Sequence, residues 1–120
     1  MKASGHELKS LKAYTSCRIS GLHFPLMALV KYRGFIVIVQ SILPIDSSTL
    51  RSGSMDAGKQ ILSSDEKLYQ KLEQAAKKLN LKPHFVKSRS DGKRVLICSA
   101  ADIEGHYGKD SRYYLIDLHR

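Results

Sequence analysis

The chain of 120 residues has no tryptophan, two cysteines, and far fewer acidic than basic residues. Cys17 and Cys98 are far apart and lack CxxC or CxxH spacing, which argues against a cysteine zinc site and a disulfide framework. The longest apolar run, Phe35–Val39, is far too short to cross a bilayer. Met1–Glu7 contains no apolar signal core. These absences predict one modest domain, with reduced thiols in the cytoplasm as the default location.

The charge balance is strongly positive. Lys and Arg number 20 against 11 for Asp and Glu, which gives a net charge of +9 and a pI near 9.7. Such a balance favours polyanionic partners, namely RNA, DNA or an anionic membrane surface. An equally consistent interpretation is a basic domain whose acidic companion lies elsewhere in a longer chain.

The first part of the chain leaves one choice open and predicts one hairpin. Residues 1–18 are polar and basic, and they form either a frayed tail or a short helix around Glu7–Tyr14. Lys31–Gly34 has the composition of a tight turn between a strand after Pro25 and the run Phe35–Val39. This run is β-branched on both faces, so it predicts a central strand buried on both sides.

The middle of the chain predicts a loop and then the clearest element, a helix over residues 64–79. Residues 45–61 are rich in Ser, Thr, Gly and Asp, and they indicate a loop with a short strand at Thr49–Gly53. Ser63 is the expected N-cap, and Glu66 completes a capping box. Asn80 suits the left-handed position after the helix. The expected apolar stripe is Leu68, Leu72, Ala75, Ala76 and Leu79.

Two further hairpins follow the helix. Asp91-Gly92 lies between the apolar runs 84–86 and 95–98, which is a strong hairpin signal. The last hairpin turns near Lys109–Ser111 and returns along Tyr113–Ile116. The order β-β-loop-α-β-β-β-β predicts, for residues 19–120, a single α+β domain: a mostly antiparallel sheet with one main amphipathic helix packed on one face.

Basic residues gather at two predicted hairpin tips. Clusters of this kind grip phosphate backbones, although they also occur as plain solvated turns. Tyr32, Tyr107 and Tyr113 would supply stacking surfaces if exposed. The nucleic-acid-binding candidates are Lys31, Arg33, Lys87, Arg89, Lys93 and Arg94.

The segment from Gly53 to Gln60 nearly matches the phosphate-binding pattern GxxxxGK[ST]. Gln60 takes the Ser/Thr place, no apolar strand leads directly into the loop, and the predicted helix begins too late. A structured turn is therefore favoured over a nucleotide-binding loop. Lys59 remains a candidate for holding a phosphate of RNA or lipid.

The C-terminal hairpin is dense in polar side chains. Three of them alternate along one strand, as convergent metal ligands would, but Gly105 and Gly108 indicate a bulge. We expect a hydrogen-bonded structural network rather than a catalytic or metal site, and we expect no metal ion and no cofactor. The members of this network are Asp102, Glu104, His106, Asp110 and Arg112.

Three successive segments resemble blocks of the Clu domain, which defines the clustered-mitochondria proteins. They are YRGFIVIVQSILP (residues 32–44), GSMDAGK (53–59) and ADIEGHYGKDSRYYLIDLHR (101–120). The resemblance covers residues 28–120 and corresponds to the C-terminal half of that domain. It implies a cytosolic, non-enzymatic protein linked to mitochondrial distribution and to messenger RNAs for mitochondrial proteins. The chain is expected to be either a fragment or a minimal relative.

Three hypotheses follow. The first is a non-enzymatic Clu-like domain that binds RNA or a protein partner. The second is a structural half-domain whose Leu22–Val30 segment covers a partner, so that the domain self-associates. The third is a phosphate-handling enzyme that uses the Gly53–Lys59 loop with Asp102 or Asp117. No small-molecule ligand is indicated.

Overall fold

The computed structural model describes residues 2–119, which form helices, short strands and connecting turns. The elements are α1 (Lys2–Ser16), β1 (Leu22–His23), β2 (Met27–Tyr32), β3 (Phe35–Gln40), a 3-10 turn (Ser47–Thr49), β4 (Leu50–Gly53), β5 (Leu62–Ser63), α2 (Glu66–Lys78), β6 (His84–Lys87), β7 (Arg94–Ile97), β8 (Glu104–Tyr107) and β9 (Tyr113–Ile116).

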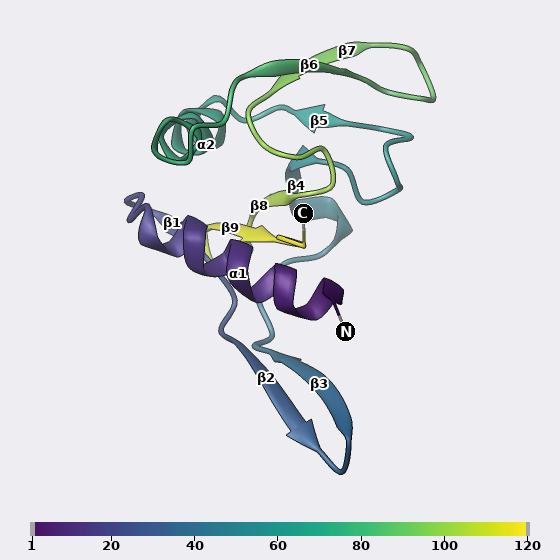
Figure 1. Ribbon diagram of the computed structural model, residues 1–120. Coiled ribbons are helices and arrows are strands. Elements are labelled where there is room, and N and C mark those ends of the chain that lie inside the picture. Colours follow the sequence, from purple (N-terminus) through teal and green to yellow (C-terminus); the bar gives the residue numbers. More distant parts are fainter. Residues whose placement is uncertain (1, 120) are drawn as a thin grey trace.

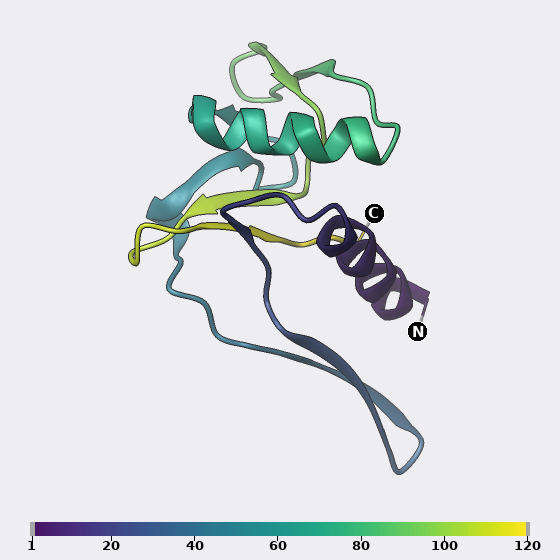
Figure 2. The same cartoon turned by 90° about the vertical axis from the view of Figure 1, so that its left-hand side faces the viewer.

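The main sheet has the strand order β1-β9-β8-β4-β5. The β1–β9 pairing is parallel, and the other pairings are antiparallel. α2 lies between this sheet and the β6–β7 hairpin, whereas the β2–β3 hairpin projects from the other side (Figures 1 and 2). The predicted α+β class, with a mostly antiparallel sheet and a main helix on one face, is confirmed.

α2 begins two residues later than predicted. Its N-cap is Asp65, whose Oδ1 accepts a hydrogen bond from the Leu68 amide at 3.0 Å. The Asp65 carboxylate also accepts from the Tyr113 hydroxyl at 3.0 Å, so the cap is tied to the sheet. The predicted cap Ser63 is wrong because Ser63 pairs with Ser52 in the sheet and therefore still belongs to β5.

The predicted capping box is also wrong, because Glu66 is the first helical residue rather than the third after the cap. The predicted apolar stripe and the end of the helix are confirmed. The predicted positions Leu68, Leu72, Ala75 and Ala76 are buried, and Leu79 packs against them. Asn80 has a φ of 58°, the left-handed conformation expected after a helix.

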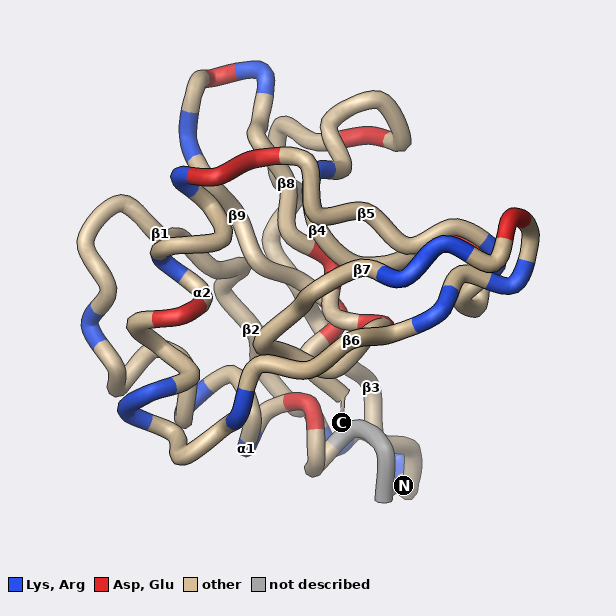
Figure 3. Tube along the Cα trace, turned by 90° about the horizontal axis from the view of Figure 1, so that it is seen from above, with Lys and Arg blue, Asp and Glu red and all other residues tan. Residues whose placement is uncertain are grey.

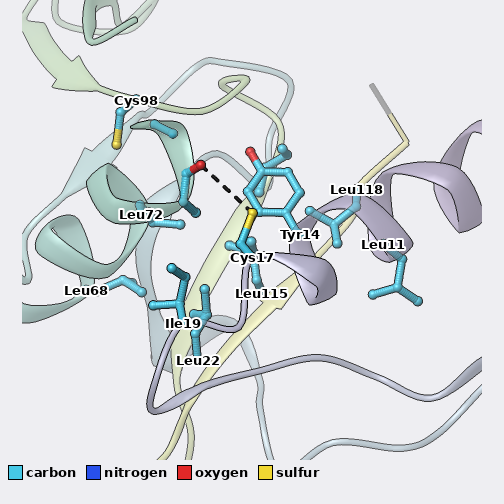
Figure 4. Close-up of a cluster of buried hydrophobic side chains, with 13 residues drawn as sticks. Leu11, Tyr14, Cys17, Ile19, Leu22, Leu68, Leu72, Cys98, Leu115 and Leu118 are labelled. Atoms are coloured by element: carbon cyan, nitrogen blue, oxygen red, sulfur yellow. Dashed lines mark hydrogen bonds between the residues drawn. The ribbon is translucent and has the colours of Figure 1, made fainter. Parts of the chain in front are cut away.

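Of the two alternatives for the N-terminal segment, the structure has the helix. α1 runs over Lys2–Ser16, beyond the expected Glu7–Tyr14 at both ends. Leu11, Tyr14 and Cys17 pack with Leu72 and Leu115, and the Cys17 thiol lies 4.0 Å from the Ala75 carbonyl (Figure 4). α1 is thus held by tertiary packing rather than by helix propensity.

The prediction that Phe35–Val39 is a central strand buried on both sides is wrong about its burial and its place in the sheet. The strand exists, and the turn before it has the left-handed pair Arg33 (φ 46°) and Gly34 (φ 82°) typical of tight hairpins. However, β3 pairs with β2 in a separate two-stranded ribbon. Phe35 is 72% exposed and Val39 51%. An apolar run shows that a strand needs cover, not which element supplies it.

The prediction of a loop with a short strand over residues 45–61 is confirmed. Its predicted short strand is present as β4, which lies inside the main sheet between β8 and β5. Asp46 caps the preceding 3-10 turn by accepting from the Ser48 amide at 2.9 Å. The two-residue strands β1 and β5 carry too little pattern to be found from sequence.

Candidate nucleic-acid interface

The β6–β7 hairpin presents a mixed aromatic and cationic face to solvent. Residues directly opposite each other in a two-stranded sheet share a face. The pairs Phe85↔Leu96 and Lys87↔Arg94 therefore lie together. Phe85 is 59% exposed, whereas Ile97, on the other face, is 2% exposed. One face of this hairpin is anchored in the protein and the other is open.

A cation stacks on the aromatic ring of this open face. The Arg94 guanidinium carbon lies 5.0 Å from the centroid of the Phe85 ring. Aromatic rings and guanidinium planes are the surfaces on which unpaired RNA bases stack. The stacking residues predicted from the sequence were Tyr32, Tyr107 and Tyr113, and Phe85 was not among them. The available signal was that Phe85 and Lys87 are two residues apart on a predicted strand, so that they share a face.

The loop that contains Lys59 is fastened to the tip of this hairpin. The Arg89 amide donates to the Gly58 carbonyl at 3.0 Å, and the Ser90 amide donates to the Lys59 carbonyl at 3.0 Å. The Ser88 hydroxyl, in turn, accepts from the Ile61 amide at 3.2 Å. Two segments about thirty residues apart in sequence thus bring their cations together. We call this exposed group the basic end: Lys59, Lys87, Arg89, Lys93 and Arg94.

Basic residues lie along both β6 and β7 on the way to the turn that joins them (Figure 3). Asp91 offsets one of its positive charges. The Asp91 carboxylate accepts a hydrogen bond from the Lys93 amide at 3.0 Å, so it shapes the turn. The basic end keeps a positive excess even when the nearby Asp56 and Asp102 carboxylates are counted with Asp91, because it has five cations.

A groove of about 540 Å³ opens beside the basic end. Lys87 and Arg89 line one side, Ala57 and Gly58 another, and Asp102 contributes a carboxylate. Asp102 lies 3.3 Å from His119 Nε2, which fixes it near the groove. A volume of this size accommodates a nucleotide-sized group.

The other two predicted nucleic-acid residues lie elsewhere. Lys31 and Arg33 are at the tip of the β2–β3 hairpin, at the opposite end of the molecule from β6–β7 (Figures 1 and 2). Arg33 stacks on Tyr32, with 5.3 Å between the guanidinium carbon and the ring centroid. The six candidates therefore form two separate clusters rather than one patch.

The loop over residues 54–60 is closed by its own side chains. Ser54 Oγ accepts from the Gly58 amide at 2.8 Å, and Asp56 Oδ1 accepts from the Gln60 amide at 3.0 Å. The hydrogen bond from the Gln60 amide is the main reason that the pKa of Asp56 is lowered. A phosphate-binding loop needs its amides directed at the ligand, whereas here the Ser54 hydroxyl accepts from the Gly58 amide and the Asp56 carboxylate accepts from the Gln60 amide. These contacts support the favoured structured turn.

The polar residues of the C-terminal hairpin form separate contacts instead of one network. Glu104 and His106 are buried side by side on β8, with 3.0 Å between Glu104 Oε2 and His106 Nε2. His106 Nδ1 lies 2.9 Å from Thr49 Oγ1. The predicted bulge lies in the neighbouring strand β4, so β8 keeps its two-residue period and these side chains share a face.

Burial decides the ionisation of this pair. Desolvation, followed by the nearby Asp117 carboxylate, raises the pKa of Glu104 to about 7. Desolvation lowers the pKa of His106. The Thr49 hydroxyl donates to the Asp46 carbonyl at 2.8 Å, so His106 Nδ1 must be the donor toward Thr49. In the neutral imidazole, Nε2 then accepts a hydrogen bond from the protonated Glu104 carboxyl group.

The remaining members of the predicted network pair locally. Asp110 accepts from the Tyr114 hydroxyl at 2.5 Å and lies 3.9 Å from Arg112 Nε, the pairing expected across this turn. Asp102 pairs with His119, outside β8. Within residues 2–119, no three His, Cys, Asp or Glu side chains are grouped closely enough to hold a metal ion. In the same residues, no helix combines the length and apolarity needed to cross a membrane.

These features define a small basic α+β domain with one anchored, cation-rich hairpin and one projecting apolar hairpin. Residues 1–120 match the family described as Clustered mitochondria. The chain belongs to this family. The predicted start of the resemblance at residue 28 is wrong, because the family match begins at residue 1.

Curated relatives agree with this assignment. The chain is 36% identical to a clustered mitochondria protein homolog of Brugia malayi and 36% identical to the clustered mitochondria protein of Arabidopsis thaliana. It is 34% identical to the protein clueless of Drosophila virilis. Each match includes 98% of this chain but only 8–9% of the relative. The chain therefore spans less than a tenth of these proteins. No solved structure matches significantly.

Proposed function

We propose that this Clu-family domain is a non-enzymatic module that binds RNA through its basic end. The observation that carries the proposal is the fastening of the Lys59 loop to the tip of the β6–β7 hairpin. It gathers five cations from two distant segments beside the exposed Phe85–Arg94 stack. Phosphate contacts from cations supply affinity, and stacked bases add to it without requiring a particular sequence.

The groove suggests which form of RNA is bound. Lys87 and Arg89 would hold phosphates at its rim, and a base would lie against Phe85 on the open face of the hairpin. Bases can be splayed out in this way only from an unpaired strand. Single-stranded RNA is therefore the proposed ligand, and Lys59 is proposed to contact its backbone rather than a free nucleotide.

The proposed role follows from the family. We infer that the domain acts in the cytoplasm, in mitochondrial distribution or in the handling of messenger RNA, as the resemblance implies. A non-enzymatic role is supported by the state of the Glu104–His106 pair. His106 is 1% exposed, so this acid–base pair has no open path to a substrate.

The test compares two double variants that remove the same charge. Lys87→Ala with Arg89→Ala alters the basic end, and Lys31→Ala with Arg33→Ala alters the opposite tip. Binding to a labelled single-stranded RNA is measured by fluorescence anisotropy at several salt concentrations. The first variant should weaken binding roughly tenfold and reduce the slope of log K against log salt by about 1.4, or 0.7 per phosphate contact.

The opposite-tip variant should leave affinity and slope near those of the unaltered chain. Equal losses in both variants would mean that the net charge of +9 attracts RNA without a defined site. Duplex RNA of the same length serves as the ligand control and should bind more weakly. Equal binding of the duplex would remove the stacking part of the proposal.

A further inference from the structure

The β2–β3 hairpin has one face made entirely of uncharged, mostly apolar side chains. Register places Val30 opposite Val37, Ala28 opposite Val39 and Tyr32 opposite Phe35. Leu26 extends the same face at the base of the hairpin, where it bonds to Ser41. Exposed fractions reach 81% for Leu26, 72% for Phe35 and 63% for Tyr32. We call these seven residues the outer face: Leu26, Ala28, Val30, Tyr32, Phe35, Val37 and Val39.

This hairpin has little support from the rest of the domain. Within residues 2–119, β2 and β3 pair only with each other. Its contacts with other elements lie at the base, where Gln40 donates to Glu7 of α1 at 3.1 Å and Met27 packs against the core. An isolated two-stranded ribbon is marginally stable in water, and packing of a second layer is the usual remedy. The outer face therefore calls for a covering layer.

The chemistry of the outer face favours a protein partner over RNA or lipid. None of the seven side chains is charged, so the face offers no phosphate contact to RNA. Two features argue against a lipid surface as the partner. A lipid surface suits a ribbon with one apolar and one polar face, but here the opposite face also carries Leu29, Ile36 and Ile38. The amides along the free edges would also lose their hydrogen bonds to water in lipid.

The outer face is complementary to itself. Its two large aromatic side chains lie at the tip, its β-branched valines lie in the middle, and the small Ala28 lies toward the base. An antiparallel two-fold pairing centred on Val30 and Val37 would lay the aromatic rings of one copy over Ala28 of the other. Isologous pairing requires this kind of large-over-small match. The projection of the hairpin also keeps the two positively charged bodies apart (Figure 2).

We propose that the outer face docks against the outer face of a second copy of this chain, in that antiparallel arrangement. The exposed area of the seven side chains is on the order of 600 Å² per copy, so two copies would bury about 1,200 Å², the lower end of the range for specific interfaces. An interface of this size suits a weak, reversible dimer rather than an obligate one. Its tips, with Lys31 and Arg33, would lie at opposite ends.

The test measures molar mass by sedimentation equilibrium of the whole chain between about 1 and 200 µM. A reversible monomer–dimer equilibrium is expected. Val37→Lys places a charge at the centre of the proposed interface and should weaken dimerisation at least tenfold. Leu96→Lys adds the same charge at an exposed position of the other hairpin and should leave it unchanged. Circular dichroism checks that both variants fold.

Cross-linking through single cysteines tests the arrangement. Cys17 and Cys98 are buried and should not react. Val37→Cys lies near the proposed axis and should be joined to its copy by a short bis-maleimide. Leu26→Cys should not, because four residues at about 3.3 Å each place it about 13 Å from the axis.

Three outcomes would overturn the proposal. The first is a monomer at every concentration. The second is a dimer that responds equally to Val37→Lys and Leu96→Lys, since it would use another surface. The third is a monomer that sediments with vesicles of phosphatidylserine and phosphatidylcholine in a Val37-dependent way, since the face would then belong to lipid. RNA binding is measured separately and does not depend on any of these results.

Discussion

The two hairpins outside the main sheet have similar local chemistry and opposite environments. Both are antiparallel ribbons of apolar strands with basic residues near the turn. β6–β7 buries Ile97 to 2% exposure and is tied at its tip to the Lys59 loop. β2–β3 leaves Val37 48% exposed and projects from the body. Strand pattern and turn chemistry make a hairpin, whereas the neighbouring elements decide whether it is a covered part of the domain or a surface for a partner.

The largest expected effect concerns the glycines that flank the two hairpin systems. Gly53, at the start of the loop that supports β6–β7, has a φ of 89°, and an added Cβ would lie 1.9 Å from the Ile103 carbonyl oxygen. Gly34, at the β2–β3 turn, also has a positive φ but open space around it. Urea unfolding should show a loss of more than about 3 kcal/mol for Gly53→Ala and about 1–2 kcal/mol for Gly34→Ala. Equal losses would mean that contact with Ile103 is relieved cheaply.

The next effect compares apolar truncations in the two hairpins. Ile97→Ala removes buried methylene groups from β7 and should lower the free energy of unfolding by about 2–4 kcal/mol. Val37→Ala on β3 should cost less than about 1 kcal/mol in dilute solution, because its side chain is half exposed. Thermal unfolding at low protein concentration checks both. A large loss at Val37 under those conditions would show that β2–β3 is supported within a single chain.

A third prediction separates the hairpins by their aromatic residues. Phe85→Ala should weaken binding of single-stranded RNA by about 1–3 kcal/mol, the usual contribution of one stacked base. Tyr32→Ala, the equivalent change at the other tip, should leave the affinity unchanged. Anisotropy titrations at one fixed salt concentration give the comparison. If the two variants lose the same affinity, the exposed ring of Phe85 is not the stacking surface.

The smallest expected effect is a pH dependence of stability that comes from the main sheet rather than from either hairpin. Its source is the buried Glu104–His106 pair. The pKa of Glu104 is raised from 4.5 to about 7, so its contribution to stability is complete below about pH 4.5 and is lost as the pH rises through 7. The pKa of His106 is lowered, so its contribution is present above its ordinary value of 6.5 and is lost as the pH falls.

Glu104→Gln removes only the first of these two dependences. The free energy of unfolding of this variant, minus that of the unaltered chain, should rise by about 1–2 kcal/mol as the pH is raised from 5 to 8. Urea unfolding at both pH values gives the difference. Glu73→Gln, which alters a carboxylate in a surface pair with Lys77 at 3.7 Å, is the control and should show no such gain. If the difference in free energy of unfolding between Glu104→Gln and the unaltered chain is the same at both pH values, Glu104 ionises normally in the fold.

Much of the local structure was predictable because its causes are local. The Asp91-Gly92 and Lys31–Gly34 turns and the stripe of α2 depend on residues within a few positions of one another. The Ser63 cap failed because pairing of Ser63 with Ser52 is a long-range contact. The basic residues at both tips were visible in the sequence. The joining of Lys59 to one tip was not, since it depends on hydrogen bonds between residues 58–59 and 89–90.

The family, the α+β class, the two hairpins and the positive charge could all be predicted from the sequence, because motifs, periodicity and composition are properties of neighbouring residues. The exposure of Phe35–Val39, the contribution of α1 to the core and the separation of the two basic tips became known from the three-dimensional structure. The physical reason is that burial is a property of whatever packs against a segment. Two ribbons with the same need for cover can therefore receive different amounts of it.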